Sequence, residues 1–457
     1  MSKISKIICA IVIVCVVFLV AGCGADEPAA PVAPVAPAAP AAPAAPAAPD
    51  PTPGGTSTDI ADFWTPADGP PTSFVVDSPV YTMENRVPWT GIFMPPEPSR
   101  REIYKAIEPD NRRENLVVGY STWNMGTPFF VAQRDAIASE AQRHGWEFIE
   151  MNSAGDVSVQ IANLETMIAR GVDVIINNPR SPEGETPTIA AAVEAGIPVI
   201  GLGSPFPPHA PVITTSGSMV YEMGFLVGIR VAEHFRDEEF LIAATSPGSM
   251  GHPMSDSKLN GFLGGFSYGR AITLGRAFDT REDAMMHGFG LFETLVARAN
   301  FRDDHLNWEV VATIPGSWSR EGGQSAAEDI LAAHPNIRLL FTDNDQQSMG
   351  AILAMRQSGF IPGVDIQLAC VGDGERQALL HVQEGEILAM ALQSPQTWAN
   401  TTTNLIYKIF HEGFDATNLP RVKPISTVVV TRDNVHEWLS DDEFATLPPV
   451  QFVPLPD

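Results

Sequence analysis

Residues 172–178 read VDVIINN, and this run decides the fold class of the chain. It is apolar almost throughout, as a strand must be when helices cover both faces of its sheet. A helical window over 158–170 leads into it through Gly171, and glycine is the residue that commonly follows the last turn of a helix. The run therefore predicts a buried strand of a parallel sheet that the chain enters from a helix.

The same strand-and-helix unit recurs on both sides of this run. The predicted strands of this first set cover 116–121, 147–151, 172–178 and 197–203, and the helical windows between them cover 128–144, 158–170 and 186–195. Gly145 and Gly196 follow their helices as Gly171 does, and Pro128 suits a first helical turn. Repeated units of this kind predict parallel strands in one sheet with helices on both of its faces.

A second set of units begins after Met219. Its helical windows cover 220–235, 281–299, 320–333, 346–358, 375–384 and 397–412, and its predicted strands cover 240–245, 309–314, 338–343, 366–371, 387–392 and 425–430. The whole pattern is too long for one ordinary open sheet, so the predicted fold class is α/β, with two doubly wound parallel-sheet lobes, a hinge and an interlobe cleft. Ligands of such sheets bind outside the carboxyl ends of the strands, which here face the common cleft.

The N-terminal segment has the pattern of a secretory signal. Two lysines precede an apolar run over 7–20, and small residues follow it. The sequence VAGC at 20–23 resembles the lipobox of bacterial lipoproteins, whose cysteine is acylated and becomes the mature N-terminus. We therefore expect a lipoprotein signal peptide at 1–22 and a lipid on Cys23, with an ordinary signal peptide or a membrane helix as the alternative.

Two further segments precede the alternating pattern. Residues 23–55 are rich in alanine and proline, and the regular prolines exclude both helix and sheet. We expect an extended tether there, which would hold a folded head away from a bilayer. Residues 56–114 contain Trp64, Trp89 and many prolines without periodicity, so we expect an irregular arm.

The composition restricts the class of protein. Lys and Arg number 28 against 54 Asp and Glu, for a formal net charge of −26. This balance argues against a nucleic-acid partner, because phosphate binding requires a basic surface. Cys370 lies in an apolar run, which predicts a small buried residue outside any disulfide. Neither an H-E-x-x-H nor a C-x-x-C motif is present, so we expect no metal and no cofactor.

Six motifs carry a resemblance to a known family. They are VVGYSTWNMGTPFF at 117–130, IARGVDVIINNP at 168–179, AVEAGIPVIGLGSP at 192–205, FTDNDQQSMG at 341–350, CVGDG at 370–374 and LQSPQTWA at 392–399. In this order they resemble the periplasmic sugar-binding proteins of the ribose/galactose type, the type I solute-binding proteins of ABC transporters. The resemblance implies a sugar or polyol ligand, an ABC permease as the membrane partner, and a monomer. We place lobe 1 at 115–219 plus 394–424, lobe 2 at 220–393 plus 425–432, and a tail at 433–457.

The same resemblance implies the binding residues. Phe129 and Phe130 correspond to an aromatic pair that stacks on a sugar ring, and Trp318 corresponds to an aromatic residue of the second lobe. The remaining candidates, four polar residues and a tryptophan in the turn after the first strand, are Asn178, Asn344, Asp373, Gln393 and Trp123. Sugars present flat C–H faces to aromatic rings and hydroxyls to carboxylates and amides, so these residue types suit such a ligand.

Several of these residues also have a purely structural interpretation. Phe129 and Phe130 stand at the start of a helical window, where both could belong to the core. Asn344 and Asp373 precede helical windows, where both could act as helix N-caps. The sequence leaves these alternatives open.

The sequence departs from the family at three places. Gly203-Ser204 replaces the Asp-Arg pair that usually follows the fourth strand. Lys258 or Met285 replaces an arginine of the second lobe, because two Gly-Phe pairs could mark its position. The segment 248–280, rich in glycine and methionine, is expected to be an insertion. These changes predict a less charged, relatively aromatic pocket and leave the ligand open.

We therefore expect a lipid-anchored, extracytoplasmic solute-binding protein of an ABC importer, located at the cell membrane. The alternative is a sensor of the same fold that presents a sugar, autoinducer or nucleoside to a membrane signalling receptor. We do not expect an enzyme. The G-x-S-x-G pattern at 265–269, around Ser267, lacks the preceding strand and following helix that such a nucleophile motif needs.

Overall fold

The computed structural model describes residues 115–447, except 205, 208, 277, 280, 417, 418, 420, 421 and 426. The expected signal peptide, Cys23, the tether, the arm and the last ten residues of the tail lie outside the described residues. Among the helices of the described part, none is both long and apolar enough to cross a membrane.

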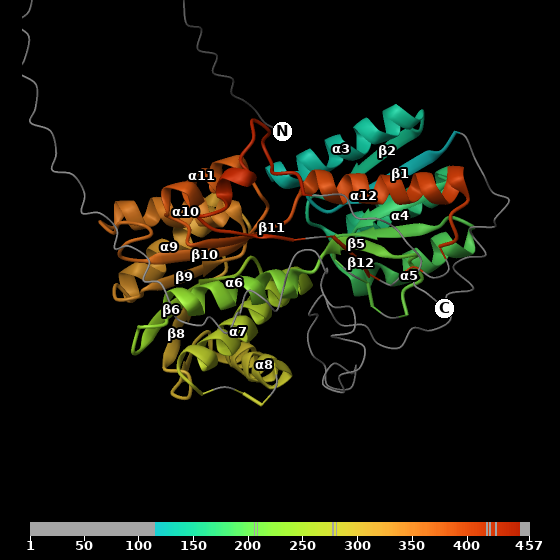
Figure 1. The fold of residues 1–457 in the computed structure, drawn as a ribbon. Coiled ribbons are helices and arrows are strands. Elements are labelled where there is room, and N and C mark those ends of the chain that lie inside the picture. Colours follow the sequence, from blue (N-terminus) through green and yellow to red (C-terminus); the bar gives the residue numbers. More distant parts are fainter. Residues whose placement is uncertain are drawn as a thin grey trace, which may run out of the picture. The chain divides into compact units, whose positions relative to one another are not determined.

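The first sheet has six strands in the order β12-β5-β4-β3-β1-β2, and all of its neighbouring pairs are parallel. Its strands are β1 (Val117–Thr122), β2 (Glu147–Asn152), β3 (Val174–Asn178), β4 (Val199–Leu202), β5 (Thr215–Ser218) and β12 (Val422–Ile425). Its helices are α3 (Pro128–His144), α4 (Val157–Arg170), α5 (Pro182–Glu194) and α12 (Pro395–Tyr407), which a π-helical turn, η4 (Lys408–Glu412), continues. We call these elements lobe 1 (Figure 1).

The second sheet has seven strands in the order β13-β11-β10-β9-β6-β8-β7, parallel except for the edge pairs β7–β8 and β11–β13. Its strands are β6 (Leu241–Ser246), β7 (Phe301–Asp303), β8 (Trp308–Thr313), β9 (Leu339–Thr342), β10 (Gln367–Gly372), β11 (Ala389–Leu392) and β13 (Val429–Val430). Its helices are α6 (Val220–His234), α7 (Pro253–Thr273), α8 (Arg281–Arg298), α9 (Arg320–Ala333), α10 (Asp345–Gln357) and α11 (Arg376–Glu384). We call these elements lobe 2.

Helices cover both faces of each sheet. In lobe 1, α3 and α12 share one apolar core with the strands, and α4 and α5 share the other. In lobe 2, α6, α7 and α8 lie against one face, and α9, α10 and α11 against the other. Cys370 on β10 is fully buried and free, as its apolar surroundings predict. The predicted α/β class with two doubly wound lobes is therefore confirmed.

The segment 248–280, which we expect to be an insertion, forms part of the lobe 2 core. Most of the segment forms α7, which is buried on nearly all sides and packs against α6 through glycines. A Cβ at Gly265 would overlap the carbonyl oxygen of Phe225, and one at Gly228 would overlap that of Phe262. A helix buried all round has no apolar stripe, and glycine lowers helix propensity, so the sequence pattern concealed it.

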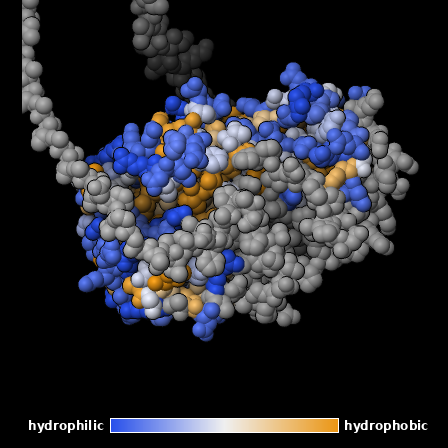
Figure 2. Space-filling view, in the orientation of Figure 1, coloured by the Kyte–Doolittle hydropathy of each residue, from blue (hydrophilic) through white to orange (hydrophobic). Residues whose placement is uncertain are grey.

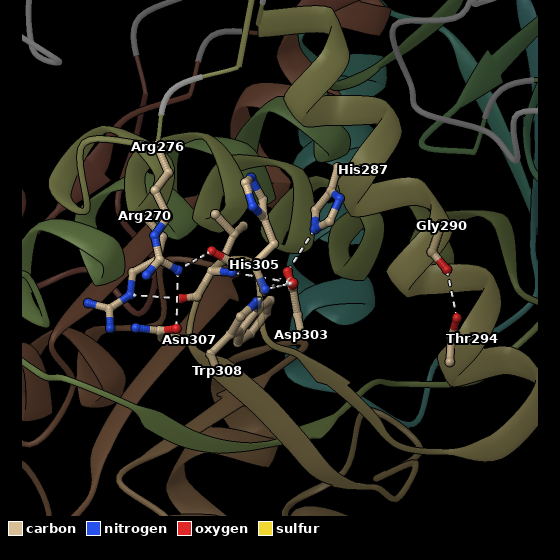
Figure 3. Close-up of polar contacts among 10 residues, drawn as sticks. Arg270, Arg276, His287, Gly290, Thr294, Asp303, His305, Asn307 and Trp308 are labelled. Carbon is tan, nitrogen blue, oxygen red and sulfur yellow. Dashed lines mark hydrogen bonds and ion pairs between the residues drawn. The ribbon is translucent and has the colours of Figure 1, made fainter.

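A polar cluster fixes the far end of α7, about 27 Å along the helix from its start. Arg270 is buried and donates from its guanidinium to the main-chain oxygens of Phe235, Glu238 and Leu306. Beside it, His287 on α8 lies 2.7 Å from the Asp303 carboxylate (Figure 3). These bonds tie α7 and α8 to the β7–β8 hairpin, which indicates a structural role for this cluster.

The predicted single strand over 425–430 is in fact two strands in different sheets. β12 joins the lobe 1 sheet and β13 joins the lobe 2 sheet, so the chain crosses between the lobes there. It also crosses after β5, at Met219, and after β11, near Gln393. These three crossings lie where a hinge between two lobes would be expected.

The described part of the tail contacts both lobes. Val435 and Leu447 belong to the lobe 2 core, whereas the Phe444 ring belongs to the lobe 1 core. The main chain of Leu447 makes two hydrogen bonds with the Thr397 hydroxyl at the start of α12.

Figure 2 shows hydrophobic residues gathered toward the middle of one face, with hydrophilic residues at its left and upper right.

Candidate functional site

All eight side chains that the sequence singles out for ligand binding line one pocket between the lobes. They are Trp123, Phe129, Phe130, Asn178, Trp318, Asn344, Asp373 and Gln393. The cavity left between them has a volume of about 70 Å³, room for a few water molecules. The structure thus brings together every predicted site residue in its described part, while their contact with a ligand stays a prediction.

The topology explains why these residues meet. Trp123 follows β1 directly, and Asn178 is the last residue of β3. In lobe 2, Asp373 and Gln393 directly follow β10 and β11. Parallel strands end at the same edge of a sheet, so residues at their carboxyl ends converge on one crevice.

Aromatic rings from both lobes touch across the pocket. The Trp123 ring of lobe 1 lies 5.9 Å from the Trp318 ring and 6.0 Å from the His252 ring, centroid to centroid. His252 and Trp318, both of lobe 2, are 5.0 Å apart and nearly perpendicular. These three rings, the aromatic triad, close the pocket, which explains its small volume.

Phe129 and Phe130 divide the two roles that the sequence left open for them. The Phe129 ring is buried and packs against Trp398 and Phe444, so it also belongs to the core of lobe 1. Phe130 is partly exposed and lies edge-on to the Trp123 ring at 5.1 Å. Phe130 is therefore the more accessible ring of the pair.

Two features hold the Trp318 indole in place: a backbone with positive φ in its own loop, and a glycine, Gly248, against which the indole packs. Ser317 and Trp318 both have positive φ, at 54° and 53°, a region that non-glycine residues rarely adopt. A Cβ at Gly248 would overlap the indole, and the indole N–H donates to the buried Asp343 carboxylate. This strained, tightly fitted loop is the kind found at functional sites.

A hydrogen-bonded network forms the lobe 2 wall. Asp373 accepts from Gln393 Nε2 at 2.6 Å and from Asn344 Nδ2 at 3.3 Å. Asn344 also caps α10, because its Oδ1 accepts from the Gln347 amide at 3.0 Å. Asp373 does not cap α11, whose N-cap residue is Glu375. The capping alternative therefore holds for Asn344 and not for Asp373.

One buried cation faces several buried acids in this wall. Lys258 Nζ donates to the main-chain oxygens of Asp343, at 2.8 Å, and Val371, at 3.4 Å. Burial raises the pKa of Asp373, although the nearby Lys258 charge lowers it. Burial also raises the pKa of Asp345 well above its usual range, and the charge of Asp373 adds to this. A ligand on this wall therefore meets several carboxyl groups and one ammonium group, that of Lys258, which offsets only part of their negative charge.

The lobe 1 wall has a neutral network. Asn178 Nδ2 and the Tyr120 hydroxyl both donate to Gln133 Oε1, at 3.0 and 2.8 Å. Gln160 Nε2 donates to the Asn178 main-chain oxygen at 2.8 Å. The Asn178 amide is thereby fixed in orientation with its oxygen available to a ligand donor.

Half of the pocket was not predicted as ligand contacts. The additional lining residues are Asn124, Thr127, Gly203, Ser204, His252, Met254, Lys258 and Trp398. Lys258 and Gly203-Ser204 had been recognised as family positions with changed residues, and Trp398 lies in a motif that matched. His252 and Met254 gave no usable signal, because they begin a helix whose pattern read as an insertion.

The arrangement suits binding more than catalysis. Rings can flank a flat apolar face, while amide and carboxylate groups can bond hydroxyls. Ser267 of the G-x-S-x-G pattern lies inside α7, buried, and not at a strand-to-helix turn. In the described part, the one group with metal-ligand spacing is His381, Glu384 and Glu386, which lies outside the pocket. Arg356 already pairs with Glu386.

Comparison with known proteins assigns the fold to a family. Residues 118–412 match the sequence profile of the periplasmic binding protein domain. The chain belongs to this family. It is 25% identical over 307 residues to the ribose import binding protein of Bacillus subtilis, covering 67% of this chain and 85% of that protein. It is 24% identical over 294 residues to the D-ribose/D-allose-binding protein of Pseudomonas aeruginosa, covering 63% and 79%.

Solved structures share the architecture. A galactofuranose binding protein superposes with a TM-score of 0.57 at 19% identity, covering 70% of this chain and 96% of its own. An ABC transporter solute binding protein from Mycobacterium smegmatis with bound glycerol superposes with a TM-score of 0.56 at 23% identity, covering 73% and 100%. These likenesses confirm the predicted fold, the profile match confirms the predicted family, and the sequence relatives are named as binding proteins.

Proposed function

We propose that this protein is an extracytoplasmic solute-binding protein of an ABC importer, and that it captures a sugar or sugar-like polyol between its lobes. The observation that carries the proposal is the pocket itself. Strand-end residues from both sheets converge on it, and it combines aromatic rings with fixed amides and carboxylates. Such a protein makes and breaks no covalent bond, and it acts only by binding and releasing its ligand.

The ring and polar groups support a sugar in particular. Trp318 and Phe130 offer faces for the C–H side of a pyranose or furanose ring. Asp373 and Gln393 offer carboxylate and amide atoms to hydroxyls, and Gln393 Oε1 has no hydrogen-bond partner in the described part. Relatives named for ribose and allose import, and neighbours named for galactofuranose or holding glycerol, support the same ligand class.

Capture requires the aromatic triad to open. The present cavity of about 70 Å³ is well below the 300–1,000 Å³ usual for ligand pockets. The three chain crossings allow the lobes to rotate, which would separate Trp123 from Trp318 and admit a ring between them. Closure would then exclude water, so each buried ligand hydroxyl needs a protein partner.

At the positions where this chain departs from the family, the charged residues that usually contact ribose or galactose are replaced. We therefore expect its ligand to make different contacts with charged side chains. Gly203 and Ser204 line the pocket where the family usually has Asp-Arg, so lobe 1 offers no charged pair to hydroxyls. Lys258 takes the place of an arginine and is held by main-chain oxygens. Recognition therefore depends more on ring stacking and on the lobe 2 acids.

The remaining parts of the proposal concern the membrane. A lipid on Cys23 and the tether over 23–55 would hold the binding domain near an ABC permease, and the domain would act as a monomer. These parts are supported by the sequence pattern alone, because the residues concerned lie outside the described range.

A thermal-shift panel tests the proposal. The ligands are D-ribose, D-galactose, D-allose, L-arabinose, myo-inositol, glycerol and adenosine. We expect at least one sugar or polyol to stabilise the wild-type protein, by about 2.7 kcal/mol when it is present at 100 times its Kd. Asp373→Asn should lose about fivefold or more in affinity, because burying an unpaired polar group costs about 1–3 kcal/mol.

The matched control is Asp329→Asn, the same change on the exposed face of α9 in the same lobe. It should bind like the wild type. The proposal would be contradicted if no sugar or polyol stabilised the protein, or if Asp373→Asn bound as tightly as Asp329→Asn.

A further inference from the structure

A second, larger cavity lies beside the pocket. It has a volume of about 580 Å³, and its wall combines residues of lobe 1, such as Arg180 and Pro207, with Ser249 and Gly251 of lobe 2. His252 lines both cavities. The lobes touch beside this outer cavity, at the aromatic triad.

The starts of three helices border the outer cavity. They are the first residues of α4, α5 and α7, represented in the wall by Val157, Pro182 and Pro253. A helix start carries a partial positive charge. Its amides are largely occupied here, because Asp156 accepts from two amides of α4, Ser181 accepts from the Gly184 amide of α5, and α5 and α7 begin with proline, which has no N–H. The helix ends therefore add only a weak general attraction for an anion.

Arg180 adds a full positive charge at the same place. Its guanidinium lies over the Trp123 ring, 5.3 Å from the centroid, between the outer cavity and the pocket. Its main-chain N–H donates to Gln160, but its side chain makes no hydrogen bond or ion pair within the described part. A guanidinium held by a ring alone keeps its donors available for a ligand oxyanion.

The acidic groups on or beside this wall are already engaged. Glu183 pairs with His209 at 3.6 Å, Asp156 caps α4, and Asp256 accepts from the Gly251 amide at 2.9 Å. None of these carboxylates neutralises Arg180 through a hydrogen bond or ion pair in the described part of the chain. The Arg180 guanidinium therefore keeps its donors available, with the Glu183 carboxylate of the same wall paired elsewhere.

His252 supplies an unused donor between the two cavities. It is 5% exposed, and its Nε2 has no hydrogen-bond partner in the described part. Nδ1 accepts from the Met254 amide at 3.3 Å, so the ring proton lies on Nε2. Burial, with the charges of Arg180 and Lys258, lowers the pKa of His252 to about 3 and keeps the ring neutral. Such a buried N–H requires an acceptor, and a bound group can provide it.

We propose that the outer cavity binds an oxyanion, a carboxylate or phosphate, carried by the ligand whose ring occupies the pocket. The inference rests on the proposed function and names its substrate class as acidic sugars or sugar phosphates. Arg180 and the Nε2–H of His252 face the oxyanion.

Calorimetric titration with matched ligand pairs tests the proposal. The pairs are D-galactose and D-galacturonate, D-glucose and D-glucuronate, and D-ribose and D-ribose 5-phosphate, with inorganic phosphate as a probe on its own. At least one acidic member should bind the wild type about tenfold more tightly than its neutral partner, as expected for one charge-assisted hydrogen bond. The preference should weaken when the ionic strength is raised.

Variants locate the effect. Arg180→Gln should abolish the preference for the acidic member, and Arg180→Lys should keep part of it because the charge remains. The control is Arg143→Gln, which removes an exposed arginine from the last turn of α3, about 22 Å of helix from the pocket. It should keep the full preference. The carboxylate and phosphate pairs distinguish the two sources of the oxyanion.

Two outcomes separate this inference from the proposed function. If neutral sugars bind and the acidic members bind no better, or if Arg180→Gln keeps the preference, the inference is overturned and the proposed function stands. If no sugar of either kind binds, while inorganic phosphate stabilises the wild type and not Arg180→Gln, the oxyanion site stands and the proposed function fails.

Discussion

The two walls of the pocket follow the same rule of construction and differ in chemistry. In both lobes, side chains follow the carboxyl ends of parallel strands. The lobe 1 wall presents rings, including Trp123 and Phe130, and the neutral amide of Asn178. The lobe 2 wall presents charges, with Lys258 beside Asp373. We therefore expect lobe 1 to recognise mainly the shape of a ligand, and lobe 2, which adds the Trp318 and His252 rings, to recognise its hydrogen-bonding groups and charge as well.

The difference has a cause in the fold. One helix, α7, brings Lys258 and His252 into the lobe 2 wall, and no described element of lobe 1 contributes a charged side chain to the pocket. The helix can reach this position because glycines let it approach α6 closely. The charge of the pocket thus depends on how α7 is packed, which the following changes can test.

The largest effect is expected where α7 meets α6. Gly265→Ala places a methyl group on the Phe225 carbonyl oxygen, so the helices must separate, at a cost of about 3 kcal/mol in the free energy of unfolding. Gly290→Ala in α8 is the matched control, because a Cβ there meets nothing within 4 Å. The control should gain up to about 1 kcal/mol. Chemical denaturation measures both, and equal effects would refute the close-packing account.

The second effect concerns the pH dependence of stability that buried carboxyl groups cause. The two lobes differ here in whether hydrogen-bond donors satisfy the buried carboxyl group. Glu222 on α6 is fully buried, and burial raises its pKa to about 8 from an ordinary value of 4.5. The folded protein then binds more protons than the unfolded chain between these values. Stability should therefore be greatest below about pH 4.5 and fall as the pH rises toward 8.

Glu222→Gln should reduce this dependence and gain on the order of 3 kcal/mol at pH 7. The lobe 1 counterpart is Glu185, a buried acid whose carboxylate accepts from Asn177 Nδ2 and the Ser181 amide, both at 2.8 Å. Glu185→Gln should gain nothing, because it breaks a satisfied pair of bonds. Thermal denaturation from pH 4.5 to 8 measures both variants, and a flat wild-type profile would contradict the prediction.

The smallest effect is expected at the aromatic triad. Gly248→Ala fills the space that the Trp318 indole occupies and displaces the ring without changing its chemistry. Ligand affinity should fall by about 1 kcal/mol, the scale of one aromatic contact, and the free energy of unfolding by about 1 kcal/mol, because the indole bond to Asp343 is disturbed. Calorimetric titration and chemical denaturation separate the two quantities. Unchanged affinity would remove Trp318 from the ligand site.

Much of the fold could be predicted from local pattern. The helices over 128–144 and 320–333 have the predicted bounds, because caps and apolar spacing are properties of short segments. The strand β5 was missed because its sequence, TSGS, has no apolar or β-branched run. The helix α7 was missed because its burial depends on its contact with another helix, α6, and a local sequence pattern does not show that contact.

The site could be predicted to the extent that it depends on strand ends. Asn178, Asp373 and Gln393 lie at or just after the ends of strands, and strand ends are visible in the sequence. The contact of the Trp318 indole with Asp343 cannot be read from the sequence, because it depends on the path of a loop with positive φ. The same holds for the outer cavity, which needs three helix starts to meet in space.

A crystal structure of the protein with the sugar that stabilises it most would test the central claim directly. We predict that the ligand ring lies between Trp123 and Trp318, which have moved apart, with hydroxyls within hydrogen-bond distance of Asp373 and Gln393. A ligand bound elsewhere on the surface, with the aromatic triad still closed as it is here, would contradict the account.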